Sequence, residues 1–213
     1  MTRATPWAAV VVLVLAVLLA GWMSPVRPAS VRSDALGPDH GEVVADYLAR
    51  AGDSLADDAD GLPRWGLVSF VAPVGMETVV ALGSDVRVGQ ILFRVPIDRV
   101  QTPLVSISVP ENPEAVRRAQ AAAAGRLSAL RFGTERAQRA GAVSAQRLAA
   151  GCECVVGAVV RGTPAQLRAV AAVPSVRVVE ALPPDAVAGR FSVSPLLPEH
   201  VDKVVPGPDD GQL

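Results

Sequence analysis

The stretch VVGAVVRGTPAQLRAVAAVPSVRVVEALPP, residues 155–184, decides the fold class. VVGAVV is typical of a buried strand, TPAQLRAVAA of a short helix, and VRVVEALPP of a second strand. Thr163 is suited to cap the helix, and Pro164 to its first turn, where a missing N–H is harmless. The stretch therefore predicts a β-α-β unit.

The same order of elements occurs earlier in the chain. GLVSFVA is strand-like, PVGMETVVALGSD can form a short helix, and VRVGQILFRVP is again strand-like. Val79 and Leu82 match Leu167 and Val170 of the later helix, with a two-residue insertion at AVPS. We interpret this as an internal duplication. Two such units are expected to interleave, giving an α+β, ferredoxin-like sandwich with an antiparallel four-stranded sheet and both helices on one face.

The segment between the units predicts one further strand and a helical insertion. LVSISV alternates Leu104, Ser106 and Ser108 with Val105, Ile107 and Val109, a pattern of a half-buried strand. Asn112 is then expected to cap a helix, and Thr134 a second helix after a break at RFGTE. The predicted domains are therefore the first unit with its extra strand at 65–110, the insertion at 111–150, and the second unit at 151–183. A Pro-rich tail at 184–213 is expected to be largely disordered.

The amino-terminal segment predicts a membrane anchor. ATPWAAVVVLVLAVLLAGWMSPV has no charged residue, and as a helix it spans about 34 Å, enough for a bilayer core of about 30 Å. Trp7 and Trp22 lie near its two ends, where indoles anchor at the interface. We predict an uncleaved signal anchor, with a transmembrane helix over residues 7–23 behind a cytoplasmic tail of residues 1–6. A cleaved signal peptide is the alternative, but no convincing small-x-small cleavage site follows.

The remainder is expected to lie outside the cytoplasm, because a long carboxyl-terminal domain crosses the membrane largely regardless of flanking charge. The protein would thus be a single-pass protein of the cell membrane that contacts membrane lipid. Residues 24–64 form a stalk with one short helix, for which Asp39 is the expected N-cap, Glu42 completes a capping box, and Gly52 ends the helix.

The chain has two cysteines, both in GCECVVGAVV, residues 151–160. On a strand, Cys152 and Cys154 would share a face with Val156, Ala158 and Val160, with Cα atoms about 6.6 Å apart. A disulfide would then need a kink, which Gly151 permits. A structural role is predicted, either a local disulfide or buried thiols; an intermolecular or redox role and a metal site are the alternatives.

No catalytic, cofactor-binding or metal constellation is recognisable in the sequence. His40 and His200 are the only histidines and lack zinc-site spacing, and no Walker loop, G-x-S-x-G or G-x-G-x-x-G motif occurs. We therefore predict a protein that is not an enzyme and needs no cofactor. The insertion has seven arginines against three glutamates, which we interpret as a solvated face; contact with lipid head groups or with an acidic partner is the alternative. A net charge of −1 and an outer location argue against nucleic acid as a partner.

The stretch VVGAVVRGTPAQLRAVAAVPSVRVVEALPP also resembles the rear half of the subtilase propeptide and inhibitor family, whose strand, short helix and V-x-x-V-E closing strand have this order. The resemblance covers about thirty residues; it implies a ferredoxin-like fold and, more weakly, inhibition of a protease by an extended tail. The chain as a whole resembles small single-span membrane proteins of actinobacteria that have no assigned function.

We therefore expect a membrane-anchored, extracytoplasmic protein-interaction or scaffold domain whose partner is another envelope or membrane protein. Two alternatives remain from the sequence. One is a thiol-dependent redox protein or sensor that uses Cys152 and Cys154, and the other is a subtilase-inhibitor-like module.

Overall fold

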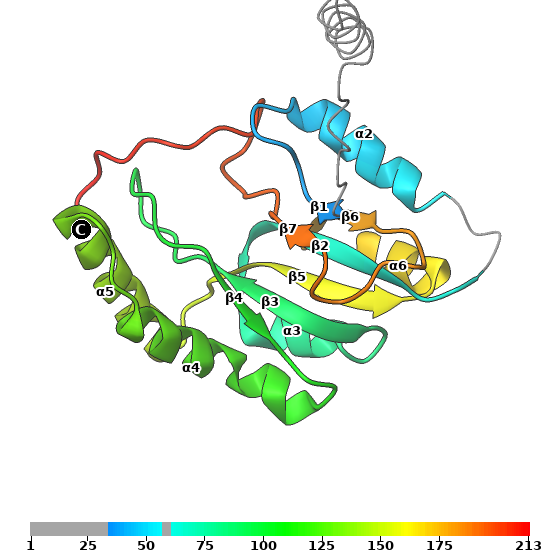
Figure 1. Cartoon of the computed structure of the whole chain (residues 1–213), viewed down its shortest axis with the longest axis horizontal. Helices are drawn as coiled ribbons and strands as arrows, with labels where there is room; N and C mark the ends of the chain where they lie inside the picture. Colours follow the sequence, from blue (N-terminus) through cyan, green and yellow to red (C-terminus); the bar gives the residue numbers. More distant parts are fainter. Residues whose placement is uncertain (1–33, 57–60) are drawn as a thin grey trace, which may run out of the picture. The chain divides into compact units, whose positions relative to one another are not determined.

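The computed structural model describes residues 34–56 and 61–213, and within them the chain is a mixed α+β structure with five helices. The elements, in chain order, are β1 Ala35–Leu36, α2 Val44–Ser54, β2 Arg64–Val74, α3 Met76–Leu82, β3 Arg87–Phe93, β4 Val105–Ser108, α4 Pro113–Ala129, α5 Glu135–Ala149, β5 Val155–Gly162, α6 Pro164–Ala171, β6 Val176–Ala181 and β7 Ser192–Val193 (Figure 1).

The main sheet has five strands in the order β4-β3-β5-β2-β6, and every neighbouring pair is antiparallel. β5 lies between β2 and β3, and β2 lies between β5 and β6. The strands of each β-α-β unit are thus separated by a strand of the other unit, the arrangement that the sequence predicted. β4 is the predicted extra strand and forms one edge of the sheet.

One face of the sheet carries the largest hydrophobic core. Val79 and Leu82 from α3 and Leu167 and Val170 from α6 are all buried in it, as their spacing predicted. Figure 1 shows α3 and α6 behind the sheet. The two helices of the insertion, α4 and α5, add small buried residues such as Ala123 to the same core. The insertion is therefore part of the domain and not an appendage.

The helix caps predicted at Asn112, Thr134 and Thr163 are present. The Asn112 side chain accepts from the N–H of Glu114 at the start of α4, and the Thr134 hydroxyl accepts from Ala137 at the start of α5. In α6, Thr163 and Gln166 form a reciprocal capping box. These starts are set by short-range hydrogen bonds, which is why the sequence indicates them well.

The opposite face of the sheet is covered in part by the residues beyond β6. β7 pairs in parallel with β1 in a small second sheet in front of the main one (Figure 1). Leu196 is fully buried, and Val204 is buried with it in a cluster that includes α2. The expectation of a largely disordered tail at 184–213 is therefore not met, because its scattered apolar residues find partners on the sheet and on α2.

The helix predicted within the stalk begins later than expected, and it packs on the domain instead of standing in a stalk, with Tyr47 and Ala51 fully buried. Its N-cap is Val43 and not Asp39, and it continues past Gly52 to Ser54. The predicted contact between Asp39 and Glu42 does form, since the Asp39 N–H donates to Glu42 Oε2 at 2.8 Å. The intervening backbone instead pairs with the tail, through Gly41 N–H to Val204 O and Val204 N–H to Glu42 O. Long-range pairing therefore displaces the helix start by several residues.

The predicted cytoplasmic tail at 1–6, the transmembrane helix at 7–23 and its anchors Trp7 and Trp22 lie outside the described residues. Among residues 34–56 and 61–213, no helix has the length and apolar character needed to cross a membrane.

Candidate functional site

Two arginines and a tryptophan form a row across three strands of the main sheet. Arg87 of β3 is directly opposite Arg161 of β5, and Arg161 is directly opposite Trp65 of β2. The guanidinium carbons lie 5.6 Å (Arg87) and 5.9 Å (Arg161) from the centre of the indole ring. Both cations therefore interact with the π-system of one buried tryptophan, which is 7% exposed.

A glycine makes room for this tryptophan. A side-chain carbon at Gly89 would lie 2.5 Å from the Trp65 ring, closer than any stable contact. Gly89 also lies at an irregularity in the pairing of β3 with β5, between Val88 and Gln90. The register that brings Arg87 opposite Arg161 thus depends on this bulge, which neither the composition nor the periodicity of the strand reveals.

Beside this row is a hollow of about 570 Å³, which we call the β4 trough. Its walls are the exposed side of β3 and β4 and the segment 188–193, and Trp65 and Arg87 lie at its lining. Phe191 borders it, with its ring 6.1 Å from that of Trp65. Leu104, which is 42% exposed, also lines it. The volume is in the range of ligand-binding sites, about 300 to 1,000 Å³.

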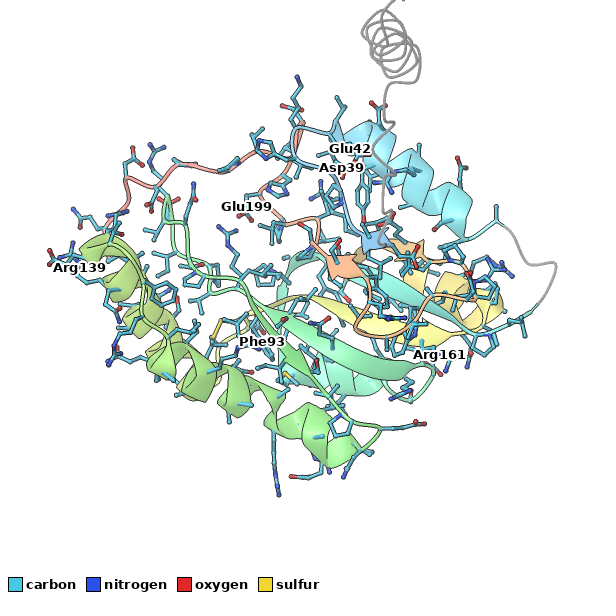
Figure 2. All side chains as sticks on the ribbon, viewed as in Figure 1. Asp39, Glu42, Phe93, Arg139, Arg161 and Glu199 are labelled. Carbon is cyan, nitrogen blue, oxygen red and sulfur yellow. A yellow bond between two sulfur atoms is a disulfide. The ribbon has the colours of Figure 1, made fainter. Side chains whose placement is uncertain are left out.

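The lining of the trough has a positive charge and no negative charge to balance it. Arg87 is the only charged residue that lines it, and no carboxylate does. Arg87 forms an ion pair with Glu111, in which Nε lies 3.4 Å from Oε2. Glu111 does not line the trough, and its side chain is largely exposed. Arg161 makes no ion pair within the part of the chain that the structure describes, and it lies at the end of β5 (Figure 2). The trough is therefore open to an anionic ligand.

A second hollow, of about 450 Å³, lies at the other side of the same two arginines. It is lined by residues of both charges, with Asp85 and Glu111 beside Arg87 and Arg161. Its charges can therefore balance one another without a ligand, and it is the weaker candidate.

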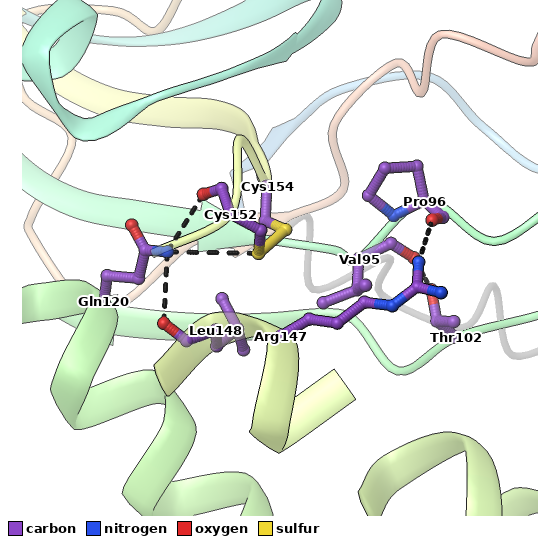
Figure 3. Close-up of a disulfide and its surroundings, with 8 residues drawn as sticks. All are labelled: Val95, Pro96, Thr102, Gln120, Arg147, Leu148, Cys152 and Cys154. Atoms are coloured by element: carbon purple, nitrogen blue, oxygen red, sulfur yellow. Dashed lines mark hydrogen bonds between the residues drawn. A yellow bond between two sulfur atoms is a disulfide. The ribbon is translucent and has the colours of Figure 1, made fainter. Parts of the chain in front are cut away.

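Cys152 and Cys154 are joined in a disulfide, with their Cα atoms 5.4 Å apart (Figure 3). The cysteines precede β5, which begins at Val155, so they do not lie on the strand as predicted. Cys154 is fully buried in the main core, and Cys152 packs against its margin. The side chain of Gln120 donates to the carbonyl of Cys152 at 2.9 Å and so ties the disulfide to α4. The disulfide joins the end of the insertion to the central strand.

The expected common face of these residues is also only partly formed. Ala158 and Val160 lie in the same core as Cys154, whereas Val156 lies in the cluster on the opposite face. The physical reason is a second irregularity in the pairing of β5 with β3, between Leu92 and Phe93, which reverses the alternation near Val156.

A buried carboxylate holds the start of the described chain to β6. Glu180 is 5% exposed and accepts hydrogen bonds from the Gly37 N–H at 2.5 Å and from the Tyr47 hydroxyl at 3.3 Å. Arg50 forms an ion pair with it and a second one, 3.1 Å, with Glu42. Burial raises the pKa of Glu180, and burial together with the charge of Glu180 raises the pKa of Tyr47. All its polar atoms are matched within the domain, so this cluster is structural.

Neither histidine forms a metal site. His200 is 9% exposed, and its Nδ1 accepts from the Leu197 N–H at 3.3 Å. Burial lowers its pKa, and the charges of Arg94 and Arg177 lower it further. Among the described residues, no group of three or more histidine, cysteine or acidic side chains is arranged to hold a metal ion.

The arginines of the insertion are mostly engaged within the protein. Arg117 and Arg118 pair with Glu114, and Arg139 pairs with Glu135. Three others bind elements outside their own helix: Arg126 donates to Ser106 O, Arg136 pairs with Asp209, and Arg147 donates to Pro96 O. This supports the interpretation that these helices do not present a free basic face.

The sequence did not reveal the arginine row or the trough. One signal for this site was present in the sequence. Trp65, a large aromatic residue, stands at the start of one predicted strand, and two other predicted strands each have an arginine at one end. Comparison with known proteins adds no assignment, because no protein-family model, curated protein or solved structure matches the chain.

Proposed function

We propose that this chain is a membrane-anchored, extracytoplasmic protein-interaction domain. The anchor is the uncharged segment at residues 7–23, with Trp7 and Trp22 at its ends, and membrane lipid is its first partner. The observation that carries the location is the disulfide between Cys152 and Cys154, because disulfides persist in oxidising compartments and are rare in the cytosol. The second partner is another envelope or membrane protein.

We also infer that the domain is a ferredoxin-like sandwich made of two duplicated β-α-β units. The interleaved order β3-β5-β2-β6 supports this, as do the equivalent buried positions in α3 and α6. The departures are the edge strand β4, the α4–α5 insertion and the covering residues beyond β6. The β4 trough arises where these additions leave part of the sheet uncovered.

The location is tested by thiol labelling of bacterial cells that express the full chain. In a Cys152→Ser/Cys154→Ser background, a single cysteine at Val201, which is 71% exposed, should react with a membrane-impermeant maleimide in intact cells. A matched cysteine at Thr2 should react only after lysis. In the unmodified protein, Cys152, which is partly exposed, should react only after reduction. Labelling of Val201→Cys only after lysis would contradict an outer domain.

The interaction is tested by photo-crosslinking in the same cells. A photoreactive amino acid at Leu104 should give a defined protein adduct, because this side chain lines the trough and is exposed. The same amino acid at Arg139, which is exposed on α5, serves as the control and should give none. Equal adducts at both positions, or none at Leu104, would argue against a partner at this face.

The redox alternative has one supporting observation, the partial exposure of Cys152 at the margin of the core. Since the bridge closes a loop with a sequence separation of 2, chain entropy gives it only about 1.5 kcal/mol of stabilisation. In urea unfolding, the free energy of unfolding of Cys152→Ser/Cys154→Ser should therefore be lower than that of the unmodified protein by only this small amount. Under our proposal the double variant still gives the photo-crosslinked adduct at Leu104. A redox role predicts that the double variant folds but no longer gives this adduct.

The inhibitor alternative requires a tail that can enter a protease cleft. The residues that would form this tail are instead held against the domain, with Leu196 fully buried and Asp209 paired with Arg136. The full chain should therefore fail to inhibit a subtilase, which an assay with a chromogenic peptide substrate measures.

A further inference from the structure

We propose that the β4 trough binds an extended peptide segment of the partner protein, one that presents a carboxylate to Arg87 and Arg161 between apolar side chains. This inference deepens the proposed function and rests on it. It names the chemistry of the partner and the place where that partner binds.

The first argument is electrostatic. Like charges directly opposite each other on neighbouring strands destabilise a sheet, and Arg87 and Arg161 are such a pair. Trp65 and Glu111 offset part of this repulsion, through the ring contacts and one ion pair. Arg161 remains without an ion pair among the described residues; it lines the second hollow, and it meets the end of the trough at the ring of Trp65. A carboxylate at the end of the trough would supply the anion that Arg161 lacks, in the geometry that guanidinium groups favour.

The second argument is the shape and lining of the trough. Leu104, directly before β4, and Ser106 and Ser108 of β4 follow one another at intervals of two residues, and all three line the trough. They therefore share a face and form a wall about 13 Å long, the length of about four extended residues. Phe191 and Val193 line the opposite side, and Gln90 and Leu92 lie on β3 between the two. A trough lined by hydroxyl, amide and apolar groups together suits a peptide, which presents polar backbone groups as well as side chains.

The third argument separates a peptide from a lipid surface. A headgroup layer is recognised by several free cations on an exposed surface. Arg87 is the only charged residue that lines the trough, and six of the seven arginines of the insertion are held by ion pairs or by backbone carbonyls. The seventh, Arg131, is exposed in the connection between α4 and α5, far along the sequence from the row. The observations therefore favour a peptide.

The test is selection of a phage-displayed random dodecapeptide library on the full chain in phosphatidylcholine nanodiscs. We expect enriched families that contain Asp or Glu beside apolar residues. Replacing that acidic residue by its amide in a synthetic peptide should weaken binding about tenfold or more, as expected for loss of a charge-assisted hydrogen bond. The same loss should follow from Arg161→Gln or Arg87→Gln.

Two further variants locate the site. In a Trp7→Phe/Trp22→Phe background Trp65 is the only tryptophan, so a selected peptide should shift its emission. Ser106 lies on the edge strand β4 and lines the trough. Ser106→Trp places a bulky side chain there, so it should fill the trough and abolish binding. Arg131→Gln removes an equal charge elsewhere and should bind as the unmodified protein does.

Three results would overturn the inference. They are the absence of any enriched family, enrichment that Arg161→Gln and Ser106→Trp leave unchanged, and binding to phosphatidylserine vesicles that depends on Arg161 when no peptide binds. Each of these leaves the thiol labelling result unaffected, so failure of this inference is distinct from failure of the proposed location.

Discussion

At the scale of single residues, the contact between Gly89 and Trp65 controls the candidate site. Gly89→Ala should displace the indole, because the added carbon would lie 2.5 Å from the ring. We expect a loss of about 1 to 3 kcal/mol in the free energy of unfolding, as for other overpacked cores. Urea unfolding followed by Trp65 emission measures it.

A matched glycine provides the control for this prediction. Gly125 lies in α4 with no atom within 4 Å of an added side-chain carbon. Gly125→Ala should therefore stabilise the protein by about 0.5 to 1 kcal/mol, through the helix preference of alanine alone. If both variants change stability in the same direction, the steric argument for Gly89 is wrong.

Glu180 gives a prediction about pH. Burial raises the pKa of Glu180 in the folded protein above the ordinary value of 4.5, so its ionisation costs stability. The unmodified protein should thus lose stability relative to Glu180→Gln as the pH rises from about 4.5 through the folded pKa. Below that window the difference should be constant. Urea unfolding of both proteins between pH 4 and pH 8 (about the range where domains are stable) measures this, and a gain in stability of the unmodified protein relative to Glu180→Gln with rising pH would contradict it.

At the scale of elements, the start of α6 offers the clearest test. Thr163→Ala removes the hydroxyl that accepts from Gln166 N–H and breaks the capping box. The expected cost is about 1 kcal/mol in the free energy of unfolding. Thr163→Ser keeps the hydroxyl and should cost much less. Equal losses in the two variants would mean that the methyl group, and not the cap, is responsible.

The sequence predicts elements well where the determining contacts are local. The caps at Asn112, Thr134 and Thr163 are examples, and so is the alternation of β4, because all depend on residues a few positions apart. It failed at α2, where the Asp39–Glu42 contact forms but backbone pairing with Val204 delays the helix. The repeat also predicted which strands are neighbours.

The order of the strands alone is not sufficient to predict the candidate site from the sequence. Arg87 lies directly opposite Arg161 only because of the bulge at Gly89. A shift of register by one residue would move either side chain to the face of the sheet that the helices cover. The second wall of the trough comes from segment 188–193, which carries no periodic pattern. Register and irregular segments depend on packing across the whole domain, so the sequence alone does not indicate them.

At the scale of the whole molecule, the residues beyond β6 are an integral layer. Leu196 is fully buried beneath α2, and Leu196→Ala should cost about 2 to 5 kcal/mol of unfolding free energy. Asp210, in the same segment, pairs with Arg99 on the surface, and Asp210→Asn should cost far less than Leu196→Ala, because solvent screens an exposed ion pair. Thermal or urea unfolding of the two variants compares them. A small effect of Leu196→Ala would restore the view of a loosely attached tail.

The pairing of β1 with β7 also has a consequence for the order of assembly. Ala35 and Leu36 are made before the main sheet, yet their partners are Ser192 and Val193, which are made after all five of its strands. A contact between such distant parts of a chain forms late, since the intervening loop must close first. During synthesis, the apolar face that Leu36 covers therefore stays exposed until residue 193 has emerged, and in that interval the nascent domain is most open to a chaperone or to aggregation.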